Sequence, residues 1–257
     1  MTVQPATRRV NRGRGHSYLL DGAPVDGVTT ALNNGYPKPG LINWAFDTAS
    51  KYAVDHWDDL AQLGAGSRLA QIQKARYAER DEAAVRGTAV HDLAQRLAAG
   101  DTVDVPEHLT GHVDAYLRFV EEWDPRELLV EVPVFSREFR YGGTTDLVAD
   151  LTDGNRWLLD WKTSKGEPYP EAALQLAAYR YAEFYLADND LEEHPMPAVD
   201  RCGIVWLRAD GYDLIPVDAG IDAFVAFGQV QQVAAFRAEP RERWIGTPLP
   251  PPAEEAA

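Results

Sequence analysis

Apolar and polar positions alternate most informatively between residues 147 and 165. Two apolar segments, 147–149 with Leu151 and 157–159, predict strands, and Asp153-Gly154 between them predicts a tight turn. The second segment consists of three consecutive apolar residues, Trp157-Leu-Leu, which is typical of a strand buried on both faces. We therefore expect a hairpin whose buried second strand ends abruptly in polar side chains.

The polar residues of this hairpin are Asp146, Asp160 and Lys162. Alternation along a strand places Asp160 and Lys162 on one face and Trp161 on the other. Asp146 joins them only if the connecting loop has an odd number of residues, because an even loop would pair it with Trp161. The sequence therefore predicts an odd-length loop if these three residues form a site.

Two carboxylates and a lysine at one sheet edge have a specific chemistry. Carboxylate oxygens suit Mg²⁺ or Mn²⁺, which can neutralise a phosphodiester and lower the pKa of a bound water. A lysine can orient that water or stabilise negative charge on phosphorus. The alternative is a solvated hairpin with ordinary polar residues. The abrupt end of a buried strand in three polar groups favours a divalent-metal phosphodiesterase.

These segments resemble motifs II and III of the PD-(D/E)xK nuclease superfamily, in particular its RecB-type exonuclease branch. Gly87-Thr-Ala-Val-His91 is similar to the GxxxH helix of that branch, and Gln175-Leu-Ala-Ala-Tyr179 is similar to its QxxxY helix. The resemblance covers about residues 80–210. It implies a divalent-metal-dependent enzyme that hydrolyses DNA from its ends in recombination, repair or phage DNA processing.

The resemblance also implies roles for single residues. Asp146, Asp160 and Lys162 would be catalytic. The metal, Mg²⁺ or Mn²⁺, would be held by His91, Asp146, Asp160 and the main-chain carbonyl of Trp161. A histidine alone on a helix is more often a packed or surface residue, but the neighbouring motifs favour a metal-ligand role for His91.

Gln175 and Tyr179 are four residues apart on a helix predicted for about 170–186, so they share a face. Their side chains could hold phosphate oxygens or brace the lysine. The alternative is that they form only the polar face of an amphipathic helix. Glu131 lies in a predicted strand at 128–135. Three roles are open for it: a metal ligand, a group that supports the site, or a charge on an edge strand. Many members of the superfamily carry a glutamate at a similar position.

Composition narrows the class of protein further. The chain has 257 residues, 45% of them hydrophobic, which is enough for a sizeable core. Its start has no hydrophobic signal region, so we expect a cytoplasmic protein without membrane contacts. The single Cys202 excludes a disulfide framework and the four-cysteine iron–sulfur cluster of several RecB-type relatives. No glycine-rich nucleotide-binding loop is present, so we expect no nucleotide cofactor.

The net charge of −15 opposes DNA binding, because an acidic surface repels phosphates. Four arginines near the start could contact phosphates, or could belong to a disordered tail; they are Arg8, Arg9, Arg12 and Arg14. The expected partner is linear DNA, aided by a recombinase, annealing or single-strand-binding protein or by homo-oligomer formation. A restriction-like or structure-specific endonuclease of the same fold, and a catalytically silent DNA-binding subunit, are the alternatives.

The predicted fold is α/β, with a restriction-endonuclease-like core of helix, three strands, helix and strand around a mixed sheet. We expect a mainly helical N-terminal elaboration with a hairpin at 1–80, a nuclease core at 81–237 and a flexible tail at 238–257. Thr29 or Thr30 should cap a short helix. Other helices are predicted at about 41–57, 67–79, 81–99, from 106 and 221–236, and strands at 202–207 and 212–217.

Overall fold

The computed structural model describes residues 6–12, 15–98, 101–164, 166–187 and 192–249, without the side chains of residues 12, 77–84, 86, 88, 91, 92, 94, 95 and 98. The elements follow in the order β1 (Arg8–Arg12), β2 (Gly15–Leu20), β3 (Ala23–Gly27), α1 (Val28–Gly35), α2 (Pro39–Asp55), α3 (Trp57–Ala61), α4 (Ala65–Ala98), α5 (Thr110–Trp123), β4 (Arg126–Ser136), β5 (Tyr141–Asp150), β6 (Arg156–Lys162), α6 (Glu171–Arg180), β7 (Phe184–Leu186), β8 (Glu193–Pro195), β9 (Arg201–Arg208), β10 (Gly211–Val217) and α7 (Ile221–Ala238).

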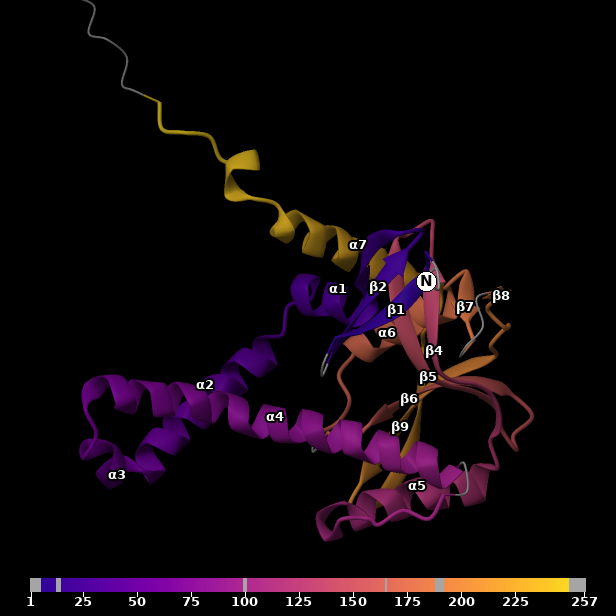
Figure 1. Ribbon diagram of the computed structural model, residues 1–257, viewed down its shortest axis with the longest axis horizontal. Coiled ribbons are helices and arrows are strands. Elements are labelled where there is room, and N and C mark those ends of the chain that lie inside the picture. The colour runs from indigo at the N-terminus through magenta and orange to yellow at the C-terminus, as the bar shows by residue number, and fades with distance from the viewer. Residues whose placement is uncertain (1–5, 13–14, 99–100, 165, 188–191, 250–257) are drawn as a thin grey trace, which may run out of the picture.

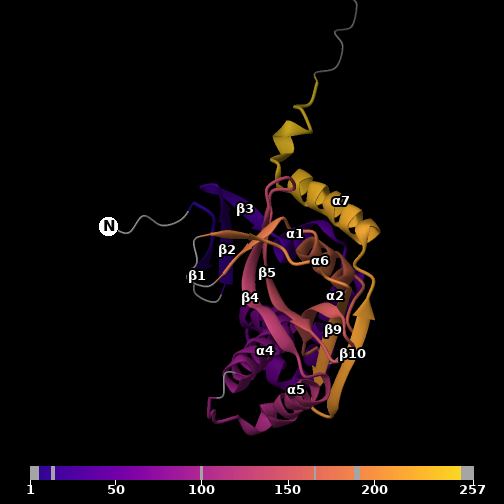
Figure 2. The ribbon, with the colours of Figure 1, turned by 90° about the vertical axis from the view of Figure 1, so that its right-hand side faces the viewer.

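The described strands form one mixed, curled sheet with helices on both sides (Figures 1 and 2). Strand β5 lies at its centre. One edge of β5 pairs with β4, and beyond β4 lie β7 and β8. The other edge pairs with β6, which leads to β9 and β10, and with β3, which leads to β2 and β1. Strands β6 and β9 are parallel, whereas β4, β5 and β6 are antiparallel, so the predicted α/β class with a mixed sheet is confirmed.

Each face of the sheet buries its own apolar cluster. Helices α1, α6 and α7 cover one face, where Val148 and Leu158 pack with Leu176 and Phe227. Helices α4 and α5 cover the other face, where Phe119 is among the buried residues. Residues 157–159 are almost inaccessible to solvent, with exposed fractions of 3% or less, because helices cover both of their faces. The prediction of a strand buried on both sides is confirmed.

The hairpin of β5 and β6 has the odd-length loop that the sequence predicted. Leu147 opposes Leu159, and Asp150 opposes Arg156, which leaves five residues between the two strands. Gly154 in the loop has a φ of +79°, the left-handed conformation that glycine adopts without strain. Extending the register by one residue places Asp146 opposite Asp160.

Two helix predictions are wrong. The helices expected at 67–79 and 81–99 are one continuous helix, α4, so the boundary expected between residues 80 and 81 lies inside it. No glycine or proline interrupts the chain there, and the local sequence can stay helical. Helix α6 ends at Arg180 rather than near residue 186, because β7 pairs with β4 and buries Phe184 against Phe135. Long-range pairing overrides the local helical pattern.

The predicted threonine cap is also wrong. Helix α1 begins at Val28 after Gly27, and no side chain caps it. Strands β2 and β3, in contrast, form the expected hairpin. Their turn is Asp21-Gly22, with φ angles of +51° and +82°, as the Asp-Gly pair favours.

Helices α2, α3 and the first part of α4 project from the sheet as an arm (Figure 1). No residue of α2 is buried. The arm folds back at residues 61–64, where Arg68 donates hydrogen bonds from Nε to the carbonyl of Leu60 (2.9 Å) and from Nη2 to that of Leu63 (3.0 Å). The Leu60 carbonyl also accepts a backbone hydrogen bond from the N–H of Leu63 (3.1 Å), so Arg68 adds side-chain bonds to the turn that follows α3. The aromatic residues of α2 are therefore not part of the buried core.

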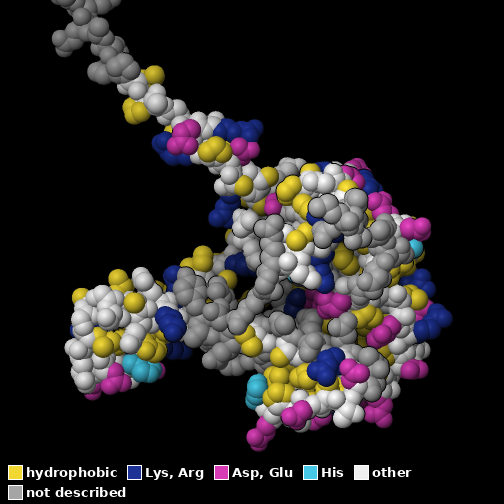
Figure 3. Space-filling model, viewed as in Figure 1, with side chains coloured by type: hydrophobic (Ala, Val, Ile, Leu, Met, Phe, Trp, Pro, Cys, Tyr) yellow, Lys and Arg dark blue, Asp and Glu magenta, His cyan; other side chains and the backbone are white. Residues whose placement is uncertain are grey.

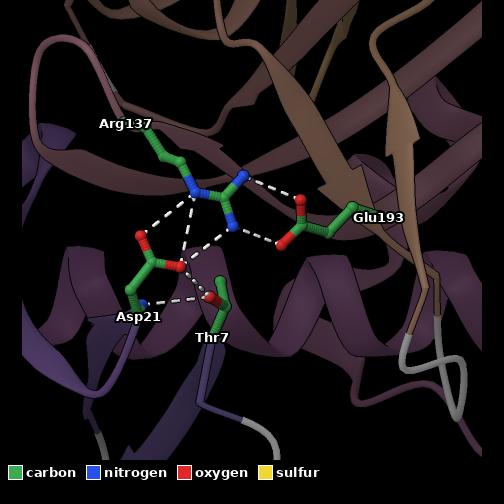
Figure 4. Close-up of polar contacts among 4 residues, drawn as sticks. All are labelled: Thr7, Asp21, Arg137 and Glu193. Carbon is green, nitrogen blue, oxygen red and sulfur yellow. Dashed lines mark hydrogen bonds and ion pairs between the residues drawn. The ribbon is translucent and has the colours of Figure 1, made fainter.

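An ion network joins the N-terminal hairpin to the rest of the sheet (Figure 4). The guanidinium of Arg137, in the turn after β4, donates to Asp21 Oδ1 (2.9 Å) and to Glu193 Oε2 (2.7 Å). Hydrogen bonds to Arg137 lower the pKa of both Asp21 and Glu193. Thr7 Oγ1 accepts a hydrogen bond from the backbone N–H of Asp21. Three segments far apart in sequence are thus held at one point.

Replacing Arg137 with methionine should lower stability slightly at neutral pH, because all three side chains are partly solvated. A carboxyl whose folded pKa is lowered contributes stability above its unfolded pKa and loses it as pH falls through the folded value. The difference between the native chain and Arg137→Met should therefore shrink below about pH 4. Urea unfolding across pH measures this. A difference that grows on acidification would contradict the assigned network.

Candidate functional site

The two aspartates and the lysine predicted from the sequence lie together where β5 and β6 diverge. Asp160 is only 2% exposed. Its Oδ2 forms an ion pair with Nζ of Lys162. Asp146 Oδ2 accepts a hydrogen bond of 2.9 Å from the backbone N–H of Trp161, the residue between the other two. The hairpin therefore brings all three polar groups to one place.

The charge of Lys162 depends on these neighbours. Burial alone would lower the pKa of its ammonium, but attraction to Asp160, followed by Asp146 and Glu171, outweighs burial and raises this pKa above its ordinary value. The side chain keeps about a third of its surface exposed (33%). A charged donor that solvent and ligands can reach therefore stands beside two carboxylates.

Helix α6 supports the site from one face of the sheet. Gln175 Nε2 donates a hydrogen bond of 2.7 Å to Asp160 Oδ1, and it also lies 3.4 Å from the hydroxyl of Tyr179. Burial raises the pKa of Tyr179 well above its usual range, and the nearby Asp160 adds to this effect. The tyrosine is therefore a neutral hydroxyl. The shared helix face predicted for Gln175 and Tyr179 is confirmed, and it points at the aspartate.

Two adjacent glycines let aromatic rings approach β5 just before the site. A Cβ on Gly143 would lie 2.5 Å from Cε1 of Tyr179, and a Cβ on Gly142 would lie 2.6 Å from Cγ of Tyr18. Both distances are too short for any side chain, so these positions require glycine. The Gly142-Gly143 pair in the sequence was a signal for this close approach.

The strand pairing changes next to Asp146. Strand β3 pairs with Gly142 and its neighbour Tyr141, and β6 pairs with residues 147–150. Both strands lie on the same edge of β5, because β4 occupies the other edge along its length. Residues 143–146 are left between them. The candidate site thus lies where neighbouring strands separate, a common position for ligand sites in α/β sheets.

Glu131 lies on β4 at the register position of Asp146, since Val130 opposes Leu147 and Val132 opposes Thr145. Its φ of +52° is in the left-handed region, which is unfavourable for a glutamate in a strand. This conformation interrupts the alternation of β4. Its charge acts on His16 and Tyr18 of β2. Backbone strain beside Asp146 marks Glu131 as part of the site's surroundings.

Helix α4 approaches the end of β6 at Gly87. A Cβ there would lie 3.3 Å from Oγ1 of Thr163, which directly follows Lys162. The lack of a side chain at Gly87 therefore lets α4 lie close to the side chain of Thr163. Val90 on the same helix is fully buried against the sheet. His91 lies one turn beyond Gly87 in α4, but its side chain lies outside the part of the chain that the structure describes.

One of the N-terminal arginines is close to the site. Arg9 Nη1 donates to Oγ1 of Thr144 at 3.3 Å, and the hydroxyl of Tyr18 shares a hydrogen bond of 2.9 Å with the same atom. Thr144 is two residues before Asp146, so β1 brings the positive charge of Arg9 to the same part of β5 as that carboxylate. Arg14 and the side chain of Arg12 lie outside the described residues. Sequence reasoning missed Tyr18 and Thr144, which have no motif of their own.

The described residues do not include three or more His, Cys, Asp or Glu side chains grouped so that they could hold a metal ion. The donor set nevertheless fits a divalent cation. Asp160 Oδ2 is fully buried and, among the described residues, meets no donor in hydrogen-bonding geometry apart from the ammonium of Lys162. A buried carboxylate oxygen that meets no other donor has the chemistry of a ligand for a hard cation. Asp146 and the carbonyl of Trp161 are the neighbouring oxygen donors.

Cys202 is a core residue. It lies in β9 with 2% of its surface exposed, and burial raises the pKa of its thiol to about 11. A protonated, buried thiol of this kind is unreactive. Among the described residues, no helix has both the length and the apolar composition needed to cross a membrane.

No protein-family model matches the chain, and no curated protein is significantly similar to it. Among solved structures, the chain is similar to one described as "Crystal structure of SSO0001", with 13% sequence identity and a TM-score of 0.32. The similarity covers 59% of this chain and 69% of that one. Any assignment of function therefore depends on the residues of this chain.

Proposed function

We propose that this α/β protein is a Mg²⁺- or Mn²⁺-dependent DNA exonuclease with a PD-(D/E)xK core of the RecB type. The observation that carries the proposal is the meeting of Asp146, Asp160 and Lys162, with Gln175 bonded to Asp160. Three of the four sequence motifs supply these groups, and all four motifs follow one another over about ninety residues in the order typical of that family. The order of α4 and α5, then β4 to β6, α6 and β9 supports a restriction-endonuclease-like core.

In this proposal Asp146, Asp160, the carbonyl of Trp161 and His91 hold the metal. The bound cation would neutralise the phosphodiester and lower the pKa of a water molecule. Gln175 keeps the Asp160 carboxylate in one orientation through its 2.7 Å hydrogen bond. Lys162 donates hydrogen bonds to the attacking water or to a phosphate oxygen, where it stabilises the charge that develops in the transition state. Tyr179 packs on Gly143 and fixes Gln175 in turn.

The acidic net charge remains consistent with a nucleic-acid substrate if positive charge is concentrated near the site. Lys162 and Arg9 supply it there. Electrostatic attraction of this local kind acts over about one Debye length, roughly 8–10 Å at physiological salt. We propose that the chain binds DNA weakly alone and acts with a partner protein or as a homo-oligomer.

The purified chain should degrade end-labelled linear DNA when Mg²⁺ or Mn²⁺ is present, and chelation of the metal should stop the reaction. Covalently closed circular DNA of the same sequence should stay intact, because an exonuclease needs an end. Gel analysis of both substrates measures this. Cleavage of the circle would instead identify an endonuclease of the same fold. Metal binding without turnover on any DNA would favour a silent DNA-binding subunit.

A further inference from the structure

A cavity of about 360 Å³ lies between the segment that joins α1 to α2 and the start of α6. Its walls include Tyr36, Pro37, Lys38, Tyr169, Pro170 and Glu171. In the space-filling view, the molecule is hollowed beside the base of the arm, and acidic and basic side chains lie at this hollow (Figure 3). A volume of this size is in the range of small-molecule subsites.

The chemistry of this cavity suits a flat, uncharged ring. Tyrosine and proline side chains supply its apolar walls, and Tyr169 is 67% exposed. The one carboxylate, Glu171, lies 3.5 Å from Nζ of Lys38, which also donates to Asn33 Oδ1 at 2.9 Å. The two charges therefore compensate each other. Aromatic surfaces near neutral groups are the platforms on which unpaired bases stack.

The cavity is close to the proposed catalytic groups. Glu171 is one helical turn before Gln175 on α6, about 6 Å along the helix axis. Gln175 donates a 2.7 Å hydrogen bond to Asp160, so the first turns of α6 border both the cavity and a proposed metal ligand. This rise of about 6 Å between Glu171 and Gln175 is comparable to the spacing of neighbouring nucleotides in an extended strand. A strand whose phosphate lies at Asp160 and Lys162 would therefore bring an adjacent base to the cavity.

We propose that this cavity binds one unpaired nucleobase of the DNA strand that is being cut, with the base stacked on Tyr169. This role of the cavity rests on the proposed nuclease function, because that function places the phosphate of the strand at Asp160 and Lys162. It makes the segment from Tyr36 to Leu41 and the start of α6 a specificity element, because the base must leave its duplex partner to enter. The chain would then engage frayed or single-stranded ends in preference to internal duplex.

The test uses the full chain and a short, labelled single-stranded oligodeoxynucleotide, with chelator present so that binding is measured without cleavage. Tyr169→Ala should weaken binding about 5- to 150-fold, the range measured for loss of one base–aromatic stack. Tyr169→Phe should bind as the native chain does, because its ring is retained. Trp57→Ala is the matched control, since Trp57 is 69% exposed but lies on α3, at the far end of the arm.

A series of oligonucleotides with one abasic site at successive positions locates the stack. At one position the missing base should remove the difference between the native chain and Tyr169→Ala, and at the others the difference should persist. Equal affinity of the two proteins, a loss that is independent of the abasic position, or no binding of the native chain would each overturn the assignment. Cleavage by the native chain with unchanged Tyr169→Ala binding rejects only the cavity. Tyr169-dependent binding without any cleavage rejects only the nuclease.

Discussion

Replacing Asp160 or Lys162 with alanine should abolish metal-dependent DNA cleavage. Asp160→Ala removes a buried carboxylate that we propose as a metal ligand, and with it the several kilocalories per mole that a bound cation contributes to the transition state. This corresponds to a loss of about 10³-fold or more in rate. Lys162→Ala leaves the carboxylates but removes the charged donor. The expected loss in cleavage rate is about 10²- to 10³-fold. Product release from end-labelled linear DNA with Mn²⁺ measures both.

The control for these variants is Asp213→Ala on β10. Asp213 is an exposed aspartate that pairs with Arg208 at 2.7 Å, so its removal changes the same charge outside the site. It should leave cleavage unchanged. Circular dichroism and thermal melting establish that Asp160→Ala and Lys162→Ala are folded. Metal-dependent cleavage that is unchanged in both variants would show that the site is wrongly assigned.

Gly143→Ala should both destabilise the protein and slow cleavage. The new Cβ would lie 2.5 Å from Cε1 of Tyr179 and 3.3 Å from Cγ2 of Val28. Tyr179 is 3% exposed, so its ring has no free space to enter and the surrounding structure must shift. Overpacking of this kind costs about 1–3 kcal/mol. Because Tyr179 contacts Gln175, which holds Asp160, the same shift should misplace the carboxylate. Urea unfolding and the cleavage rate measure the two effects.

Gly228→Ala provides a matched control for this substitution. Gly228 lies inside α7, and a Cβ there would meet no heavy atom within 4 Å. Alanine is favoured over glycine in a helix by about 1 kcal/mol, so this variant should be at least as stable as the native chain and cut DNA equally well. A Gly143→Ala protein that matches Gly228→Ala in stability and cleavage would mean that Tyr179 does not pack on β5 as described.

The hairpin at the centre of the proposed site was predictable from the sequence. Strand alternation, the turn residues Asp153-Gly154 and the run of apolar residues after them are local properties. They predict the two strands, and the odd loop followed from them only on the condition that Asp146 shares a site with Asp160 and Lys162. The i and i+4 spacing of Gln175 and Tyr179 is likewise a property of one helix. Each of these predictions concerns residues that are close in sequence, where backbone geometry restricts the possible arrangements.

Other features depend on contacts between distant segments, and only the tertiary structure decided them. Helix α6 ends early because β7 pairs with β4, and α2 is exposed because the arm projects from the sheet rather than packing on it. The positions of Arg9 and Tyr18 beside Thr144 depend on the parallel pairing of β3 with β5. The sequence by itself determined which polar groups the hairpin presents. The tertiary structure decided which helix holds them and which cavity lies beside them, because long-range packing has no local sequence signal.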